Sequence, residues 1–167
     1  MEVGFSLGTN LGDRFKNLTD AKERLLAFDD TELLALSSAY DTQPVGVKDE
    51  YMDMTFLNSV VIINTSASCE TWLERIGNIE QELGRVREGD RNAPRPIDID
   101  ILYAGDAIID SGGLQVPHPR WAERRFVVEP LAEVRPELVL PGIGEPVARV
   151  LEGLAAGEAV AKLEQGW

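Results

Sequence analysis

Apolar residues recur at two spacings in the first half of the chain, and these spacings predict alternating strands and helices. Residues 3–8 have the composition of a short strand, and residues 13–28 carry leucines at helical spacing. Two further apolar stretches, 31–40 and 56–65, are rich in strand-forming residues. The polar segment 45–54 joins them, and a connection of that length is typical of a lid or a binding loop.

The second half continues this alternation of elements. Residues 70–84 place apolar side chains on one helical stripe, with Glu80 at its border. Residues 97–110 predict a hairpin around Ala-Gly-Asp, and residues 145–164 are compatible with a helix. The order strand, helix, strand, strand, helix, strand predicts an α+β, ferredoxin-like βαββαβ sandwich with additional strands and a C-terminal helix. We expect one domain over 1–167, because no repeat or linker-like stretch divides the chain.

Composition narrows the class of protein. The chain has 167 residues, 44% of them hydrophobic, and no apolar run reaches the length of a membrane span, so we expect a soluble protein without a membrane partner. The N-terminal residues lack the pattern of a signal peptide, which favours the cytoplasm. Cys69 is the only cysteine, so neither an internal disulfide nor a multi-cysteine metal site is possible, and we assign it no function.

The charge of the chain is segregated. The formal net charge of -13 opposes nucleic-acid backbones and argues against nucleic-acid binding. Two short segments are nevertheless basic, and they favour a local site for a polyphosphate; they contain Arg85, Arg87, Arg91 and Arg95 in the first, and His118, Arg120, Arg124 and Arg125 in the second.

Two acids interrupt the isoleucines of "NAPRPIDIDILY". Side chains alternate faces along a strand, so Asp98 and Asp100 point away from the face that carries Ile97, Ile99 and Ile101. Neighbouring carboxylates repel each other unless cations lie between them, and hard oxygen ligands suit Mg²⁺ together with substrate phosphates. The alternative is the solvated outer face of an edge strand, which is the commoner explanation of an isolated D-x-D. The adjacent arginines favour the metal site.

Other motifs limit the chemistry. The chain has no G-x-x-x-x-G-K-[ST] loop, and "SLGTNLGD" is not a G-x-G-x-x-G fingerprint, so neither common nucleotide-binding loop is present. His118, the only histidine, has no sequence partner for a catalytic triad. It either donates to a phosphate or makes a structural hydrogen bond in its loop.

Taken together, the motifs resemble a known family. "SLGTNLGD", "YDTQPVG", "FLNSVV", "IGNIEQELGRVR", "APRPIDIDIL" and "VPHPRWAERRFVVEPL" are similar to the hydroxymethyl-dihydropterin pyrophosphokinases of folate biosynthesis over about residues 4–142. Members of that family are small α+β enzymes with a ferredoxin-like fold. They transfer the terminal diphosphate of ATP to the pterin hydroxymethyl group and release AMP.

The resemblance implies roles for the charged residues. Asp98 and Asp100 would hold two Mg²⁺ ions that bridge the phosphates of the co-substrate ATP. Arg85 and Arg95, in a loop that closes over the site, would grip the triphosphate and stabilise the charge that develops during attack. The resemblance also implies further nucleotide contacts at Glu80, Arg87, Arg91, Ile101, His118 and Arg124.

The resemblance likewise implies a pterin site. Phe56 and Phe126 would stack on the ring, and Asn58 would hydrogen-bond its edge. The Thr42 to Val45 stretch, with Thr42, Pro44 and Val45, would form part of the wall. Without the family, the two phenylalanines would be interpreted as ordinary core residues.

The chain departs from the family at three positions: Asn92 where many members have tryptophan, Gly77 for a common glutamine, and Pro119 for a tyrosine. We therefore expect looser lid closure and altered nucleotide contacts. The expected protein is a monomeric, Mg²⁺-dependent diphosphokinase that binds ATP and hydroxymethyl-dihydropterin. Two alternatives remain: a ferredoxin-like binding module without turnover, and a Mg²⁺-dependent nucleotidyltransferase that releases diphosphate.

Overall fold

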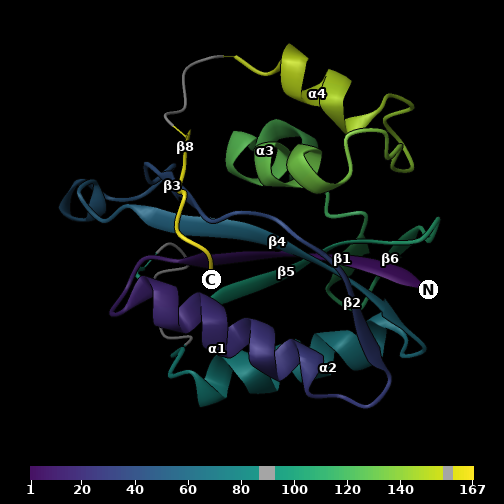
Figure 1. Ribbon diagram of the computed structural model, residues 1–167, viewed down its shortest axis with the longest axis horizontal. Helices are drawn as coiled ribbons and strands as arrows, with labels where there is room; N and C mark the ends of the chain where they lie inside the picture. Colours follow the sequence, from purple (N-terminus) through teal and green to yellow (C-terminus); the bar gives the residue numbers. More distant parts are fainter. Residues whose placement is uncertain (87–92, 156–159) are drawn as a thin grey trace.

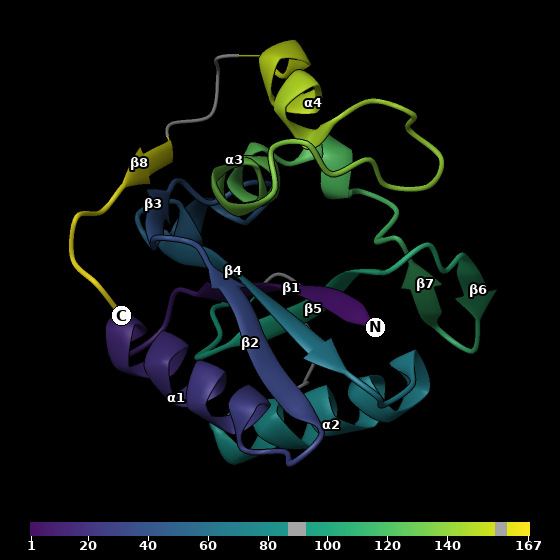
Figure 2. The same cartoon turned by 45° about the vertical axis from the view of Figure 1, so that its right-hand side comes forward.

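The computed structural model describes residues 1–86, 93–155 and 160–167, which form a sheet with helices on both faces (Figures 1 and 2). The helices α1 and α2 cover one face of the sheet, and α3 and α4 lie over the other. The strands are β1 (Glu2–Thr9), β2 (Thr31–Leu36), β3 (Tyr40–Thr42), β4 (Phe56–Thr65), β5 (Asp98–Ala104), β6 (Ile109–Ser111), β7 (Leu114–Val116) and β8 (Val160–Lys162). The α-helices are α1 (Arg14–Leu26), α2 (Cys69–Glu82), α3 (Arg125–Val134) and α4 (Val147–Gly153).

The main sheet is antiparallel and has the strand order β5-β1-β4-β3-β8, with β2 also pairing with β4. The first strand therefore lies between the last strand of the core motif and β4, as in a ferredoxin-like βαββαβ unit. This arrangement confirms the predicted α+β fold class.

The helices α1 and α2 form because both have a polar N-cap and an apolar stripe. The side chain of Asp13 accepts from the Lys16 backbone N–H at the start of α1, and Ser68 caps α2 in the same way. The stripes bury Leu18 and Trp72 completely against the sheet. Burial of a large apolar side chain stabilises a fold by roughly 1.5–3 kcal/mol, so these two helices are held by packing.

The opposite face of the sheet packs against α3, which the sequence patterns did not predict. Val128 and Leu131 of this helix are fully buried in a second core cluster with Leu102 of β5 and Trp121. Pro130 lies inside α3, and a proline in a helix interior argues against a helix when only the sequence is considered. Phe126 of α3 forms part of one wall of the cavity described below.

The predicted strand 31–40 is divided into β2 and β3. Ser37 lies at the break, where its hydroxyl accepts from the Val60 backbone N–H at 2.9 Å and lies 2.9 Å from the hydroxyl of Ser59. A side-chain hydroxyl thus takes the place of a backbone partner, which interrupts the regular strand.

The predicted hairpin around Ala-Gly-Asp is wrong. β5 pairs with β1, whereas β6 pairs with β7 in a separate two-stranded sheet. Gly112 and Gly113 form the turn between β6 and β7, and both have positive φ, as a tight two-residue turn requires. Gly105 donates its backbone N–H to the Glu2 carbonyl and ends β5 without reversing the chain.

The predicted helix 145–164 is only partly correct. α4 ends at Gly153, residues 156–159 lie outside the described residues, and β8 pairs antiparallel with β3. The open edge of β3 offers backbone partners, and tertiary pairing of this kind overrides a weak helix propensity. Within the described parts of the chain, no helix has the length and apolarity needed to cross a membrane.

Candidate active site

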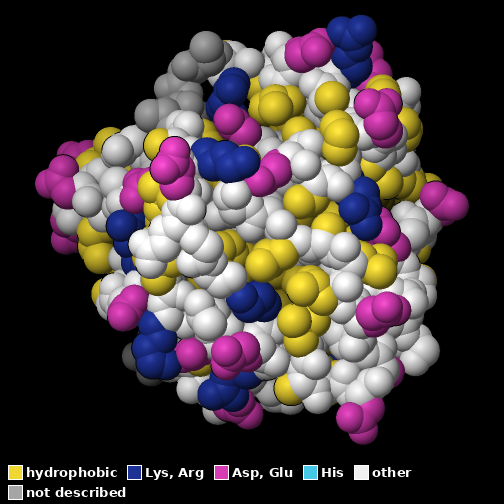
Figure 3. Space-filling model, viewed as in Figure 1, with side chains coloured by type: hydrophobic (Ala, Val, Ile, Leu, Met, Phe, Trp, Pro, Cys, Tyr) yellow, Lys and Arg dark blue, Asp and Glu magenta, His cyan; other side chains and the backbone are white. Residues whose placement is uncertain are grey.

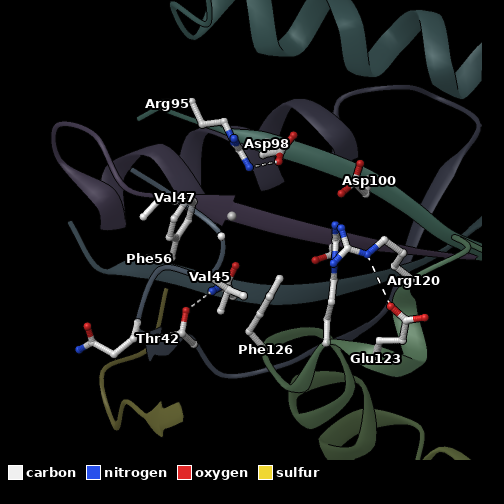
Figure 4. Close-up of a pocket in the computed structure, with 16 residues that line it drawn as sticks. Thr42, Val45, Val47, Phe56, Arg95, Asp98, Asp100, Arg120, Glu123 and Phe126 are labelled. Atoms are coloured by element: carbon white, nitrogen blue, oxygen red, sulfur yellow. Dashed lines mark hydrogen bonds and ion pairs between the residues drawn. The ribbon is translucent and has the colours of Figure 1, made fainter. Parts of the chain in front are cut away.

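A cavity opens where β5, β1 and β4 meet the loop after β3 and the segment that leads into α3 (Figure 4). Its lining combines small backbone positions, aromatic rings and charged groups. The lining residues are Ser6, Gly8, Thr42, Gln43, Val45, Gly46, Val47, Phe56, Asn58, Arg95, Asp98, Asp100, Arg120, Glu123, Arg124 and Phe126.

The two acids lie on the cavity face of β5, as the alternation of the strand predicts. Ile97, Ile99 and Ile101 are buried in the core on the other side, with exposures of at most 6%. β5 lies at an edge of the sheet, as the alternative explanation of the D-x-D motif assumed. Both acids also line the cavity, where the side chains of Asp98 and Asp100 are 23% and 42% exposed, so this face is accessible to solvent and belongs to the candidate site.

Asp98 is held by two arginines. Nη1 of Arg85 donates to its Oδ1 at 2.5 Å, and Nη2 of Arg95 lies 2.7 Å from its Oδ2. Arg85 also donates to Oε1 of Glu80 at 2.5 Å, and the same oxygen accepts from the Ile99 backbone N–H at 2.9 Å. Desolvation lowers the pKa of Arg85, but the charges of Asp98 and Glu80 outweigh it and raise the pKa. These contacts join the end of α2 to the first residue of β5.

Asp100 has a more open environment. Its side chain is 42% exposed to the cavity, against 23% for Asp98, and Nε2 of His118 lies 4.0 Å from its Oδ2. The surrounding protein restricts access to bulk water, and this desolvation, followed by the charge of Asp98, raises the pKa of Asp100 to about 6. The positive charge of Arg124 opposes the shift. A cation at this carboxylate would relieve the repulsion.

His118 and Arg124 complete the basic side of the cavity. The His118 backbone N–H donates to the Leu102 carbonyl at 2.8 Å, and its Nδ1 accepts from the Arg120 N–H at 3.1 Å, so Nε2 faces Asp100. Burial, followed by the charge of Arg124, lowers the pKa of His118. Among the described residues, no carboxylate forms an ion pair with Arg124 within 4.0 Å; its guanidinium carbon lies 5.7 Å from the centre of the Phe126 ring. This half-buried cation is suited to bind an anionic ligand.

The other end of the cavity has an aromatic and amide lining. Phe56 and Phe126 project into it below the two acids in the view of Figure 4. Nδ2 of the buried Asn58 donates to Oγ1 of Thr42 at 2.7 Å, which fixes the amide. Gly8 leaves room for this amide, since a Cβ there would lie 2.9 Å from Oδ1 of Asn58. A flat heterocycle with mixed donors and acceptors would fit such a lining.

The structure brings most of the predicted residues together. Nine of them line the cavity: Thr42, Val45, Phe56, Asn58, Arg95, Asp98, Asp100, Arg124 and Phe126. Arg85 contacts Asp98, His118 lies 4.0 Å from Asp100, and Glu80 contacts Arg85 behind them. Pro44 is buried next to the wall and does not line it. The side chain of Ile101 lies in the core, away from the cavity, and Arg87 and Arg91 lie outside the described residues.

Several lining residues were missed. Ser6 and Gly8 come from "SLGTNLGD", where the glycine was interpreted only as the end of a strand. The motif itself was the available signal, because a glycine in a strand often marks a close approach. Arg120 and Glu123 also line the cavity, although the resemblance gave them no role.

Two of the three positions at which the chain departs from the family pattern lie within the described residues. Gly77 lies in α2, and no atom lies within 4 Å of where its Cβ would be, so a larger side chain would find open space there. Pro119 is exposed. Asn92 lies outside the described residues.

Comparison with known proteins shows which family this chain is similar to. A family model described as 7,8-dihydro-6-hydroxymethylpterin-pyrophosphokinase matches residues 4–136. The 2-amino-4-hydroxy-6-hydroxymethyldihydropteridine pyrophosphokinase of Bacillus subtilis is 43% identical over 77% of this chain and 75% of its own length. The protein of the same name from Methylorubrum extorquens is 42% identical over 81% of this chain and 84% of its own length.

Longer relatives are similar to this chain over part of their length. The folic acid synthesis protein fol1 of Pneumocystis carinii is 40% identical over 90% of this chain, which spans about a fifth (20%) of that protein. The solved structure of Plasmodium falciparum HPPK-DHPS has a TM-score of 0.71 with 15% identity, covering 90% of this chain and 42% of that one, and shows the same fold. On these matches, the chain belongs to the 7,8-dihydro-6-hydroxymethylpterin-pyrophosphokinase family, the pyrophosphokinases of folate biosynthesis.

Proposed function

We propose that this chain transfers diphosphate from ATP to 6-hydroxymethyl-7,8-dihydropterin, giving the pterin diphosphate and AMP. One observation carries the proposal: a single cavity joins an aromatic and amide pocket to a strand with paired acids and flanking arginines. The first part suits a pterin, and the second suits a triphosphate. Membership of the family supports the same reaction.

The pterin would bind between Phe56 and Phe126. Asn58 would hydrogen-bond the ring edge with the amide atoms that Thr42 leaves unused. Val45 would close the wall beside them. In this position the hydroxymethyl group of the substrate points towards the acids of β5.

Asp98 and Asp100 fit two Mg²⁺ ions. Mg²⁺ usually takes one or two carboxylates and completes its coordination with water and substrate phosphates, so two acids on one strand face are sufficient. The open carboxylate of Asp100, with its raised pKa, fits a site for a cation. When bound, the ions would supply charge neutralisation at the ATP phosphates.

The arginines would act on the phosphates during transfer. The pterin hydroxyl oxygen would form a bond to the β-phosphorus, the bond from that phosphorus to the bridging α-β oxygen would break so that AMP leaves with this oxygen, and the hydroxyl proton would pass to solvent. Arg95 would stabilise the charge that accumulates on the transferred group, and Arg85 would hold Asp98 in place. His118 and Arg124 would bind phosphate oxygens. No covalent enzyme intermediate is needed, because positioning and charge stabilisation suffice.

The remaining nucleotide contacts are proposed on the resemblance. Glu80 would hold Arg85 and the start of β5 in position, as its hydrogen bonds with Arg85 and the Ile99 backbone N–H suggest. Ile101 would contribute backbone atoms, since its side chain is buried. Arg87 and Arg91, which lie outside the described residues, would bind phosphates.

We further propose that residues 1–167 act as one monomeric domain, and that use of ATP favours the cytoplasm as its place of action. Light scattering of the purified chain would test the monomer.

Phosphorus NMR tests the reaction itself. Purified protein, ATP, Mg²⁺ and hydroxymethyl-dihydropterin should yield AMP and a pterin diphosphate. Free diphosphate would indicate a nucleotidyltransferase, ADP would indicate simple phosphorylation, and binding without any product would indicate a binding module. Each of these three outcomes would contradict the proposal.

A further inference from the structure

An exposed ion pair at the cavity rim has no role in the mechanism above. Nε of Arg120 lies 3.6 Å from Oε2 of Glu123, and the two side chains are 61% and 69% exposed. Both line the cavity, and Figure 4 shows Arg120 entering from the side on which Asp100 lies. The separation exceeds that of a normal hydrogen bond, so the pair is weak and easily exchanged.

The backbone under this pair is firmly anchored. The Arg120 backbone N–H donates to Nδ1 of His118 at 3.1 Å, and the next residue, Trp121, is 3% exposed in the upper core. A short 3-10 turn, Trp121–Glu123, connects the two charged residues. The side chain of Arg120 is therefore free to rotate while its Cα stays at the rim.

Arg120, Arg124 and His118 bring positive charge together at this rim, opposed by Glu123 and by Asp98 and Asp100 in the same cavity. After burial, the charge of Arg120 is the next contribution that lowers the pKa of Arg124, and it also lowers the pKa of His118. Glu123 is the one carboxylate within 4.0 Å of Arg120 among the described residues. Such crowding of cations is relieved when an anion binds between them. Elsewhere the charges are mixed: on the face shown in Figure 3, basic and acidic side chains are interspersed.

We propose that Arg120 is a further binding residue for the diphosphate group of the substrate, and that Glu123 is an internal anion that pairs with it until the phosphates arrive. The inference rests on the proposed function. A phosphate offers a guanidinium two parallel, charge-assisted hydrogen bonds, whereas Glu123 offers one long contact. The incoming phosphates therefore displace Glu123, and Arg120 joins Arg124 and His118 at the anion.

The test measures binding of α,β-methylene-ATP with Mg²⁺ by calorimetry, because this analogue is not cleaved at the bond that the reaction breaks. Arg120→Gln should weaken binding about tenfold, since a charge-assisted contact is lost. Arg120→Lys should lose less, because the charge remains. Glu123→Gln should tighten binding about threefold by removing the competing carboxylate, and should have no such effect in the Arg120→Gln background.

The chain contains a matched control pair. Arg149 and Glu152 on α4 have the same three-residue spacing and exposures of 69% and 63%, but no residue of α4 lines the cavity. Arg149→Gln and Glu152→Gln should leave binding unchanged. The Arg120 effect should also shrink at high salt, while the thermal midpoint of the free protein stays the same.

Three results decide between this inference and the proposed function. If the wild-type protein forms AMP and the pterin diphosphate but Arg120→Gln binds the analogue as Arg149→Gln does, the role of Arg120 is wrong and the function stands. If Glu123→Gln weakens binding, the role of Glu123 is wrong. If the wild-type protein forms no AMP, the proposed function is wrong, and the inference that rests on it is lost as well.

Discussion

Asp98 and Asp100 lie two residues apart on the same face of β5, and their surroundings differ. Both oxygens of Asp98 are held by arginines, at 2.5 Å and 2.7 Å. Among the described residues, the one basic side chain with a nitrogen within 4.0 Å of the Asp100 carboxylate is His118, at 4.0 Å. The exposed fraction of the side chain rises from 23% to 42% between the two acids.

This difference shows that the D-x-D motif is not symmetric. Asp98 belongs to a compensated network in which Glu80 and Arg85 join the end of α2 to β5. Asp100 is left open towards the cavity, where repulsion from Asp98 favours binding of a cation. Without ligands, Asp98 thus positions the arginines, and Asp100 is the more accessible of the two proposed metal ligands.

The largest expected effect lies on the arginine side of this comparison. Arg95→Ala should lower kcat by about 10³ or more, by analogy with arginines that stabilise transferred phosphoryl groups. The expected change in KM for ATP is smaller. Steady-state AMP formation measures both, with Arg149→Ala as a control for an exposed arginine outside the cavity. A variant that loses only ATP affinity would contradict the assignment of Arg95 to the chemical step.

Replacing either acid should also reduce turnover. Asp98→Asn and Asp100→Asn should each lower kcat by about 10²-fold or more, because each removes a carboxylate from the proposed metal site. Mg²⁺ titrations of activity should show a raised requirement in both variants. Near-full turnover in either one would remove that acid from the metal site.

The compensated network should contribute to stability. Glu80 is 1% exposed, and its loss leaves the buried Ile99 N–H without its acceptor and leaves Arg85 with Asp98 as its remaining carboxylate partner. Glu80→Ala should lower the free energy of unfolding by about 3 kcal/mol, measured by urea denaturation without ligands.

Glu82→Ala is the control for that measurement, because Glu82 lies two residues further along α2, is 59% exposed and pairs with Arg24. An exposed pair contributes at most about 1 kcal/mol. Equal losses for the two variants would show that the buried network adds nothing specific.

The sequence was informative about β5 because the two-residue period of a strand fixes which side chains share a face. Alternation alone placed Ile97, Ile99 and Ile101 in the core and both acids on the opposite face, as the structure shows. The helices α1 and α2 were predicted within about two residues at each end, since their apolar stripes are local patterns.

The remaining features depend on partners that are distant in the sequence. β8 forms because β3 has a free edge, and α3 is stabilised by a core that includes Leu102 and Trp121. Asp98 is the acid that pairs with Arg85 and Arg95, whereas the alternation of the strand treats both acids alike. No local pattern specifies such pairings. The sequence placed Arg120 in a basic segment suited to a polyphosphate, but it gave no sign that Glu123 would lie beside it at the cavity.

The smallest expected effect concerns the pH dependence of stability. The pKa of Asp100 rises from an ordinary value of 3.8 to about 6 in the folded protein. Between these values the folded state binds more protons than the unfolded state, so the charged carboxylate destabilises the fold increasingly as the pH rises through this window. Asp100→Asn should therefore have a higher thermal midpoint than the wild-type protein at pH 7 in EDTA, and this difference in midpoint should shrink towards pH 4. Asp98→Asn should melt below it at pH 7, because the ion pairs to Arg85 and Arg95 are lost. A gap between wild type and Asp100→Asn that stays constant from pH 4 to pH 7 would show that the two acids do not differ in this way.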